Sequence, residues 1–314
     1  MRQGPLPSPD AASAADRLVS ELGTYGSCLV AFSGGADSAL VLAAAVRALG
    51  AGRTAAFTAV SPAVPAAERA AAASFAAALG VRHLVIGTGE LDVAGYRENG
   101  PRRCYFCKSV VLDAALRVAA EHGLRTVATG TNADDVRDPF RPGIGAGAER
   151  GVRTPLAAAG LTKAEVRRVS REWGLVTWDK PAAPCLSSRI AYGVPITPAR
   201  LARVERAELA LRRRFAAAGL AVRDLRVRDL GGPVRVEVDA EHVAAVAGLA
   251  IGDLLAEAGF AGTGRVAVVA FRSGALNDGL PEPGRRPAEP AEPAGTGDTA
   301  AGGDAGATDS HDPV

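Results

Sequence analysis

The sequence predicts an α/β fold, a doubly wound parallel sheet followed by a smaller C-terminal α+β domain. Short apolar runs alternate with segments of helical period from about Asp10 to about Val176, a pattern typical of parallel sheets. A glycine-rich turn directly after the first apolar run opens a helix. After about Ile190 the order of elements changes, which indicates a second domain.

The first domain, expected at residues 10–190, contains strands and helices in alternation. Strands are expected at Cys28–Phe32, Arg53–Val60, Arg82–Ile86 and Arg125–Thr129. Helices are expected at Asp10–Gly23, Ser38–Leu49, Pro65–Gly80 and Lys108–His122, and from Thr162 to about Trp173. Thr162 and Glu165 have the spacing of a capping box, so the last helix is expected to begin there.

The second domain, expected at residues 191–280, begins with a long helix, Pro198–Ala218. Two runs of period 2 follow, Val222–Leu230 and Val234–Val238, then another helix and the strand Arg265–Phe271. We expect this domain to bind substrate or to mediate oligomerisation.

The two ends of the chain differ from these domains. Residues 1–9 are expected to form a flexible N-terminus. Residues 281–314 are rich in Pro, Gly, Ala and acids and contain almost no large apolar side chain. Such a segment cannot bury enough surface to offset its chain entropy, so we predict a disordered acidic tail.

Charge and composition exclude several classes of protein. The 314 residues carry a formal net charge of +2, and the basic surplus of the part before the tail suits anionic small molecules better than nucleic acid. No apolar run is long enough to span a membrane, and the N-terminus lacks the apolar region of a secretory signal. Four cysteines are too few for a secreted disulfide scaffold, so we expect a cytoplasmic protein without a membrane partner.

The glycine-rich turn, Ser33–Ser38, has the features of an anion-binding loop. Backbone N–H groups at the start of a helix attract phosphate, and Gly34 and Gly35 let the backbone approach it closely. Ser33 and Ser38 add hydroxyl donors, and Asp37 is suited to hold Mg²⁺ on a leaving pyrophosphate. The spacing excludes a Walker A loop. A tight turn with a helix cap is the alternative interpretation.

A second loop follows the expected strand Arg125–Thr129, at the sheet edge where such folds bind ligands. Its candidate cofactor-binding residues are Gly130, Thr131, Asn132, Asp134 and Asp135. The two acids could share the metal of the first loop. The alternative is a turn that is simply rich in Asn and Asp.

The motif Ser-Gly-Gly-x-Asp-Ser after the first strand resembles the pyrophosphate loop (PP-loop) of N-type ATP pyrophosphatases. The resemblance implies that the sheet is of the PP-loop type and that Mg-ATP is the cofactor. It also implies the reaction: the enzyme adenylates a carboxyl or carbonyl oxygen, releases pyrophosphate, and lets a sulfur or nitrogen nucleophile displace AMP.

A series of further segments is similar to one subfamily, the LarE family of ATP-dependent sacrificial sulfur transferases. These segments are Arg102–Lys108, Arg141–Gly143, Gly151–Leu156, Thr177–Pro181, Cys185–Arg189 and Phe271–Gly274. The resemblance implies that the substrate is pyridinium-3,5-biscarboxylic acid mononucleotide, which becomes a thiocarboxylate on the way to the nickel-pincer cofactor of lactate racemase. It also implies that Cys185 is the sulfur-bearing, catalytic cysteine. Lys180 and Arg189 lie close enough in sequence to lower its pKa.

Cys104 and Cys107 form a C-x-x-C motif and, with Cys185, supply three thiols. Some members with three such cysteines are thought to hold a 4Fe-4S cluster, which would donate the sulfur and let the enzyme turn over. We favour this arrangement, and three thiolates with an open position suit iron–sulfur chemistry. Simple thiols with Cys185 as the sacrificial donor, a zinc site and a redox disulfide remain alternatives. Cys28, on the first strand, is expected to pack only.

The substrate carries a phosphate and carboxylates, so the site needs fixed cations and hydrogen-bond donors. The candidates for binding it are Ser188, Arg189, Arg226, Arg228 and Arg272. For any single arginine a solvated surface position is the alternative, because the chain is rich in Arg and has only three lysines. Because the chain uses arginine for nearly all its basic residues, a lysine at a given position hints that an ammonium group is required there.

Other functions remain open. A tRNA-thiolating pyrophosphatase should bring an RNA-binding module or a basic patch, and an ammonia-using synthetase should not need Cys185. A non-catalytic nucleotide-binding protein would not need both the loop and the cysteine. The expected partners are the nucleotide substrate, further copies of the chain in a homo-oligomer, and other enzymes of nickel-pincer cofactor synthesis.

Overall fold

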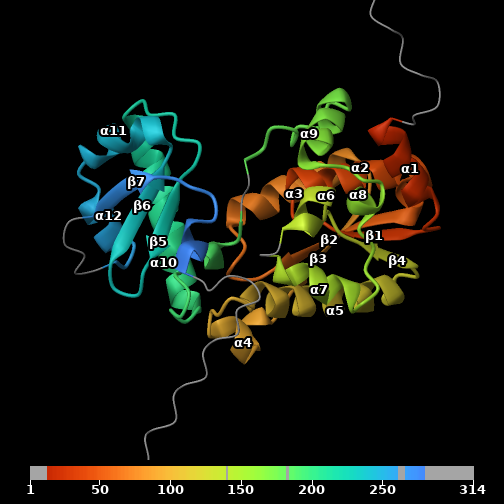
Figure 1. The fold of residues 1–314 in the computed structure, drawn as a ribbon, viewed down its shortest axis with the longest axis horizontal. Helices are drawn as coiled ribbons and strands as arrows, with labels where there is room; N and C mark the ends of the chain where they lie inside the picture. The colour runs from red at the N-terminus through yellow and green to blue at the C-terminus, as the bar shows by residue number, and fades with distance from the viewer. Residues whose placement is uncertain (1–12, 139–140, 182–183, 261–265, 280–314) are drawn as a thin grey trace, which may run out of the picture. The chain divides into compact units, whose positions relative to one another are not determined.

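The computed structural model describes residues 13–138, 141–181, 184–260 and 266–279, which belong to one compact unit. The flexible N-terminus predicted for residues 1–9 and the acidic tail predicted for residues 281–314 lie outside the described residues. The described part contains two sheets (Figure 1). Among its helices, none is both long and apolar enough to cross a membrane.

The first sheet is parallel throughout and has the strand order β3-β2-β1-β4. Its strands are β1 (Cys28–Ala31), β2 (Thr54–Val60), β3 (Arg82–Gly87) and β4 (Thr126–Ala128). The chain moves from β1 outward to β3 and then returns to the other side of β1 for β4. The strand order therefore reverses between β1 and β4, which is where open α/β sheets bind ligands.

Helices cover both faces of this sheet, which confirms the predicted doubly wound fold (Figure 1). The core on one face includes Val30 and side chains of α1 (Ala14–Gly23), α2 (Ala36–Leu49), α3 (Ala66–Ala78) and α9 (Lys163–Glu172). The core on the other face joins Leu29 and Phe57 to Leu112 of α5 (Arg103–Glu121). Adjacent strand residues such as Leu29 and Val30 face opposite layers, as the period of a strand requires.

Helix α5 begins at Arg103, five residues before the predicted start at Lys108. The side chain of Arg103 is buried and donates to Oδ1 of Asn99 at 2.6 Å, which ties down the first turn. Cys104 and Cys107 therefore lie on the helix. The sequence analysis also missed the short helices α4 (Ala94–Arg97), α6 (Ala133–Arg137), α7 (Pro142–Ala148) and α8 (Pro155–Ala158).

The C-terminal part has a sheet and a core of its own. It contains α10 (Pro198–Ala217), β5 (Arg226–Asp229), β6 (Val234–Val238), α11 (Val243–Ala247), α12 (Gly252–Glu257) and β7 (Ala267–Ala270). β5 pairs antiparallel with β6, and β6 pairs parallel with β7. The core joins Leu211 and Phe215 of α10 to Val227 and Val236 of the sheet. The domain boundary expected at residue 190 stays a prediction.

The predicted strand Val222–Leu230 is shorter in the structure, where it begins at Arg226. The carboxylate of Asp239 accepts hydrogen bonds from the backbone N–H groups of Arg223 and Asp224, at 2.7 and 3.3 Å. These two residues are therefore bonded to a side chain instead of to a neighbouring strand.

Candidate active site

The glycine-rich turn joins β1 to α2, as the sequence predicts. Gly34 has a φ of +75°, which would strain any residue with a side chain. The hydroxyl of Ser38 donates to the carbonyl of Gly35 at 3.1 Å and accepts from the N–H of Ser33 at 3.3 Å. The turn thus closes over the start of α2, where free backbone N–H groups favour an anion.

The second loop lies directly against the first. The side-chain oxygen of Asn132 caps α6 by accepting from the N–H groups of Asp134 and Asp135, both at 3.0 Å, and its Nδ2 donates to Oδ1 of Asp37 at 3.3 Å. A Cβ on Gly130 would lie 2.7 Å from the backbone nitrogen of Ser38, so only glycine permits this approach. The two loops, predicted separately, therefore form one site.

Lys163, which the sequence analysis left without a role, is part of this site. Nζ of Lys163, at the start of α9, pairs with the carboxylate of Asp37. The backbone N–H of Lys163 donates to Oδ2 of Asp134 at 2.8 Å. Lys163 therefore ties the start of α9 to both loops.

Lys180 also contacts the first loop, although it lies far from that loop in sequence. Its Nζ donates to the carbonyl of Gly34 at 2.9 Å and to Oε2 of Glu68 at 2.8 Å. The third lysine of the chain, Lys108, lies at the pockets described below, so all three lysines belong to this region. The scarcity of lysine in the sequence was the signal that pointed to them.

The loops and these lysines line an open pocket of about 640 Å³. Its cations are Arg141, Lys163, Arg167 and Lys180. Its carboxylates are Asp37, Asp134, Asp135 and Asp138. Cations bind phosphate oxygens and carboxylates bind a divalent metal, so the pocket can accommodate a metal-bound pyrophosphate group.

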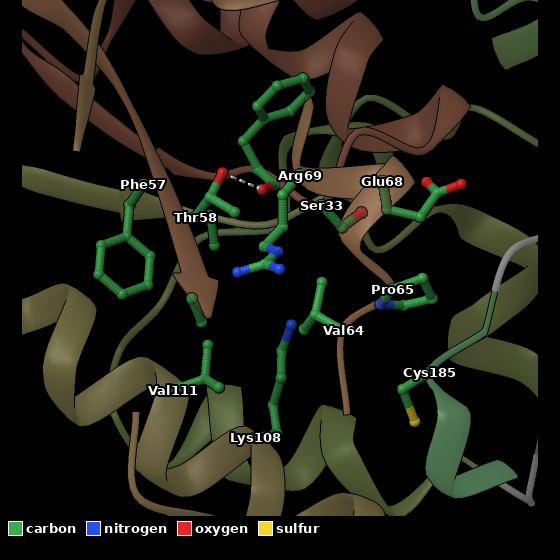
Figure 2. Close-up of a pocket in the computed structure, with 13 residues that line it drawn as sticks. Ser33, Phe57, Thr58, Val64, Pro65, Glu68, Arg69, Lys108, Val111 and Cys185 are labelled. Atoms are coloured by element: carbon green, nitrogen blue, oxygen red, sulfur yellow. Dashed lines mark hydrogen bonds between the residues drawn. The ribbon is translucent and has the colours of Figure 1, made fainter. Parts of the chain in front are cut away.

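A second pocket, of about 200 Å³, opens beside Ser33 at the ends of β1 and β2 (Figure 2). Phe57, Val64 and Val111 make much of its wall apolar. Arg69 from α3 and Lys108 from α5 point into it (Figure 2). Apolar walls with two cations suit a nucleoside and its phosphate. We call this the nucleotide pocket.

A third pocket, of about 310 Å³, contains the three cysteines of the predicted sulfur site. Cys104 and Cys107 come from the first turns of α5, and Cys185 comes just before the 3-10 turn Leu186–Arg189. We call this the cysteine pocket. Among the described residues, Lys108 and Cys185 line both it and the nucleotide pocket.

The cysteine pocket disfavours negative charge. Burial raises the pKa of Cys107 well above its ordinary value, and the neighbouring Cys185 and Glu90 raise it further. Burial lowers the pKa of Lys108, while the adjacent Cys107 opposes that shift. Within the described part of the chain, no group of three or more His, Cys, Asp or Glu side chains could hold a metal ion. Cys28 is fully buried in the core, as expected for a packing residue.

Comparison with known proteins identifies the family. No protein-family model matches the chain. The pyridinium-3,5-bisthiocarboxylic acid mononucleotide synthase of Lactiplantibacillus plantarum is 35% identical over 195 residues, which cover 62% of this chain and 70% of that protein. The chain belongs to the LarE family.

Uncharacterised proteins from two other organisms also resemble this LarE-family chain. One, from Synechocystis sp., is 44% identical over 215 residues, covering 68% of this chain and 77% of the relative. The other, from Methanocaldococcus jannaschii, is 27% identical over 142 residues, covering 45% of this chain and 53% of the relative.

Two of the predicted substrate-binding arginines already have carboxylate partners in this member of the LarE family. Arg189 is buried and makes two hydrogen bonds to Glu208, at 2.9 and 3.1 Å, and a third to the carbonyl of Cys185 at 3.2 Å. Arg228 donates to Glu237 at 2.6 Å and to the carbonyl of Ser188 at 2.8 Å. Both arginines therefore hold the segment around Cys185 in place. Their binding of substrate stays a prediction.

The other predicted substrate-binding residues have different surroundings. Arg226 lines a pocket of about 340 Å³ beside Arg189, and burial followed by the charge of Arg189 lowers its pKa to about 10. An anion bound there would offset this excess of positive charge. Arg272 is exposed and pairs with Asp278, and the hydroxyl of Ser188 donates to the carbonyl of Cys185 at 2.7 Å. The substrate contacts of these three residues are likewise untested predictions.

Proposed function

We propose that the protein is an ATP-dependent sulfur transferase of nickel-pincer cofactor synthesis. Its proposed substrate is pyridinium-3,5-biscarboxylic acid mononucleotide, of which it converts a carboxylate to a thiocarboxylate. The observation that carries the proposal is that Cys185 lines both the nucleotide pocket and the cysteine pocket. A thiol in this position can meet an activated carboxyl group. The name of the Lactiplantibacillus plantarum relative supports the choice of substrate.

The first half of the reaction is adenylation. A carboxylate oxygen of the substrate attacks the α-phosphorus of ATP, the bond to the β-phosphate oxygen breaks, and pyrophosphate leaves. The open pocket of the two loops would receive the pyrophosphate, with Lys163 and Lys180 beside its oxygens. The substrate now carries an acyl adenylate, whose AMP is a good leaving group.

Mg²⁺ fits the donors of the open pocket. Asp37 lies on the first turn of α2, and Asp134 lies on the second loop close to it. When bound, the ion would neutralise charge on the departing pyrophosphate. Lys163 already pairs with Asp37, so it would compensate for the negative charge of this carboxylate when the metal is absent.

The second half of the reaction brings in sulfur. If Cys185 is itself the donor, its thiolate attacks the acyl carbon and AMP leaves, giving a thioester. Loss of the Cys185 Cα proton and cleavage of the Cβ–S bond then release the thiocarboxylate and leave dehydroalanine in the chain. Each chain would react once.

We favour a 4Fe-4S cluster held by Cys104, Cys107 and Cys185 as the sulfur source. Cys104, Cys107 and Cys185 line one pocket and would hold the cluster, because thiolates are the ligands that iron–sulfur clusters take. A cationic group would also offset the burial and the neighbouring acidic groups that raise the pKa of Cys107. When bound, such a cluster supplies sulfide and spares the cysteines.

We also propose that the chain forms a homo-oligomer and passes its product to other enzymes of the same synthesis. The thiocarboxylate is only an intermediate on the way to the nickel cofactor, so a further enzyme must consume it.

The test is anaerobic turnover. Purified protein with Mg-ATP, the biscarboxylic acid mononucleotide and sulfide should release AMP and pyrophosphate and form a thiocarboxylate, detected by mass spectrometry. Pyrophosphate release without sulfur transfer, with ammonia as the accepted nucleophile, would assign the chain to a different reaction. No ATP cleavage under any of these conditions would overturn the proposal.

A further inference from the structure

We propose that Asn99 is a positioning residue, which fixes the register between the helix that carries Cys104 and Cys107 and the segment that carries Cys185. The consequence for sulfur transfer rests on the proposed function, whereas the geometric part of the proposal does not.

Asn99 is fully buried and has a φ of +56°, the one positive φ at a non-glycine position among the described residues. Its Nδ2 donates to the carbonyls of Ala191 and Val194, at 2.8 and 2.9 Å, and makes a longer contact with that of Ile190 at 3.3 Å. Its own carbonyl accepts from the N–H of Gly193 at 3.2 Å. One side chain therefore satisfies the backbone of the loop that follows Cys185.

The other end of the amide reaches α5. Oδ1 of Asn99 accepts from Arg103 at 2.6 Å, and the same NH1 group of Arg103 donates to the carbonyl of Ile190 at 3.3 Å. Arg103 precedes Cys104 directly. The contacts of Asn99 and Arg103 therefore join the start of the C-x-x-C helix to the residues just after the 3-10 turn.

A second connection lies between Cys185 and the loop that Asn99 holds. The hydroxyl of Tyr96 is 2.5 Å from Oγ of Ser187, and both residues are buried. Both also line the cysteine pocket. Cys185 is thus followed within two residues by a bond to Tyr96 and within nine residues by the bonds to Asn99.

The amide of Asn99 is chemically suited to this role. Only an amide of this size donates to several carbonyls with one end and accepts from an arginine with the other. Asn also tolerates the left-handed backbone better than other residues with side chains. Glycine would keep the backbone unstrained but would leave buried carbonyls without their donor.

The consequence concerns the thiols. Cys107 and Cys185 come from segments about 80 residues apart, and both line one pocket. A displacement of about 1 Å between reacting groups can lower a rate by about 100-fold. Loss of the Asn99 contacts should therefore separate the thiols while the ATP-binding loops, which lie elsewhere on the sheet edge, keep their structure.

The experiment measures thiol proximity directly in the full-length, metal-free protein. A Cys104→Ser background leaves Cys107 and Cys185 as the pair to be bridged, because Cys28 is fully buried. Dibromobimane becomes fluorescent when it alkylates two neighbouring thiols, and peptide mapping identifies the pair. Asn99→Gly should lower the bridging rate about tenfold or more, and Tyr96→Phe should lower it several-fold.

Two controls are needed. The first distinguishes a change in thiol position from a general loss of stability, and the second distinguishes the role of Asn99 from the proposed reaction. Val166→Ala truncates a buried side chain of α9 in the first sheet's core and should leave the bridging rate unchanged. In the native cysteine background, Asn99→Gly should still release pyrophosphate from ATP but lose thiocarboxylate formation. If the wild type makes no thiocarboxylate, the proposed function fails, and the bridging rates still decide the role of Asn99.

Two outcomes would overturn the proposal. One is a folded Asn99→Gly protein that bridges Cys107 and Cys185 at the rate of its parent. The other is a parent protein in which the two thiols do not bridge at all. If Asn99→Gly does not fold, Tyr96→Phe decides the question, and an unchanged bridging rate in that variant rejects the proposal that these contacts fix the two segments relative to one another.

Discussion

Lys108 and Cys185 come from segments far apart in sequence, and both line the nucleotide pocket (Figure 2). Both also line the cysteine pocket. An ammonium group and a thiol are thus placed at the junction where the proposed acyl adenylate would meet the sulfur donor. Lys108 makes no ion pair with a carboxylate in the described part of the chain. Its amine is therefore available to a ligand, and a bound anion would offset the burial that lowers the pKa of Lys108.

Lys108→Met should lower sulfur transfer about 100-fold, because one fixed charge beside the reacting group is lost. Lys108→Arg should retain more of the activity. Arg117→Met removes an exposed cation of the same helix that pairs with Glu121, and it should have no effect. Thiocarboxylate formation under anaerobic conditions is the measurement. Equal activity in Lys108→Met and wild type would exclude a role for this ammonium group.

Asp37→Asn should fold normally but release pyrophosphate about 100-fold more slowly, because the proposed Mg²⁺ loses a carboxylate ligand and Lys163 loses its partner. Asp113→Asn is the matched control, since Asp113 pairs with Arg150 on an exposed surface. Pyrophosphate release is followed at saturating Mg-ATP. A wild-type rate in Asp37→Asn would show that the first loop does not act on the phosphates.

Cys185→Ala should abolish sulfur transfer and still permit pyrophosphate release, because adenylation does not need the thiol. The mass of the wild-type chain after turnover then separates the two sulfur routes. A sacrificial Cys185 loses about 34 Da, one sulfur with two hydrogens, and Cys104→Ala and Cys107→Ala each keep that single turnover.

If a cluster is the donor, the chain keeps its mass, and each of the three Cys→Ala variants loses iron. An iron-free protein that makes one equivalent of product and shows the mass loss would contradict our preference for the cluster.

Glu165 should contribute to stability in a way that depends on pH. The backbone N–H and the hydroxyl of Thr162 donate to its carboxylate, both at 2.9 Å, and these bonds lower the pKa of Glu165 below its ordinary value. The folded pKa lies below the unfolded one, so the contribution is present above the unfolded pKa and is lost as the pH falls through the folded pKa. The melting temperature of the wild type should fall between about pH 5 and pH 3 as Glu165 is protonated, and that of Glu165→Gln should fall less over the same range.

Thr162→Ala tests the same helix start at neutral pH. The loss of its cap should cost about 1 kcal/mol and lower the melting temperature by about 2–4 °C. Because Lys163 follows directly, ATP cleavage should slow as well. A slower rate with an unchanged melting temperature would assign Thr162 to the pyrophosphate pocket and not to the helix cap.

Much of the fold could be predicted because periodicity and turn chemistry are local. The four strands of the first sheet were expected within two residues of their observed ends, and Thr162 caps α9 through the predicted capping box. The position of the first loop was likewise predictable, because a glycine-rich turn between an apolar run and a helical segment marks the junction of a strand with a helix.

The features that the sequence did not predict depend on contacts between side chains. The start of α5 was predicted five residues too late. Its first turn is stabilised by the hydrogen bond from Arg103 to Asn99, and the hydrophobic periodicity of the sequence does not reveal a bond between two polar side chains. The sequence likewise did not show that Arg189 and Arg228 pair with Glu208 and Glu237 from other elements, and their binding of substrate stays a prediction. Sequence spacing shows which arginines share a strand face but not which carboxylate lies opposite them.

All three lysines of this chain lie at the proposed site, so amine chemistry reports on that site alone apart from the N-terminal amine. An amine-reactive reagent that leaves arginine untouched becomes a footprinting reagent for the nucleotide and pyrophosphate pockets. Protection by ATP would be visible in the mass of the intact protein, without digestion and without any substitution.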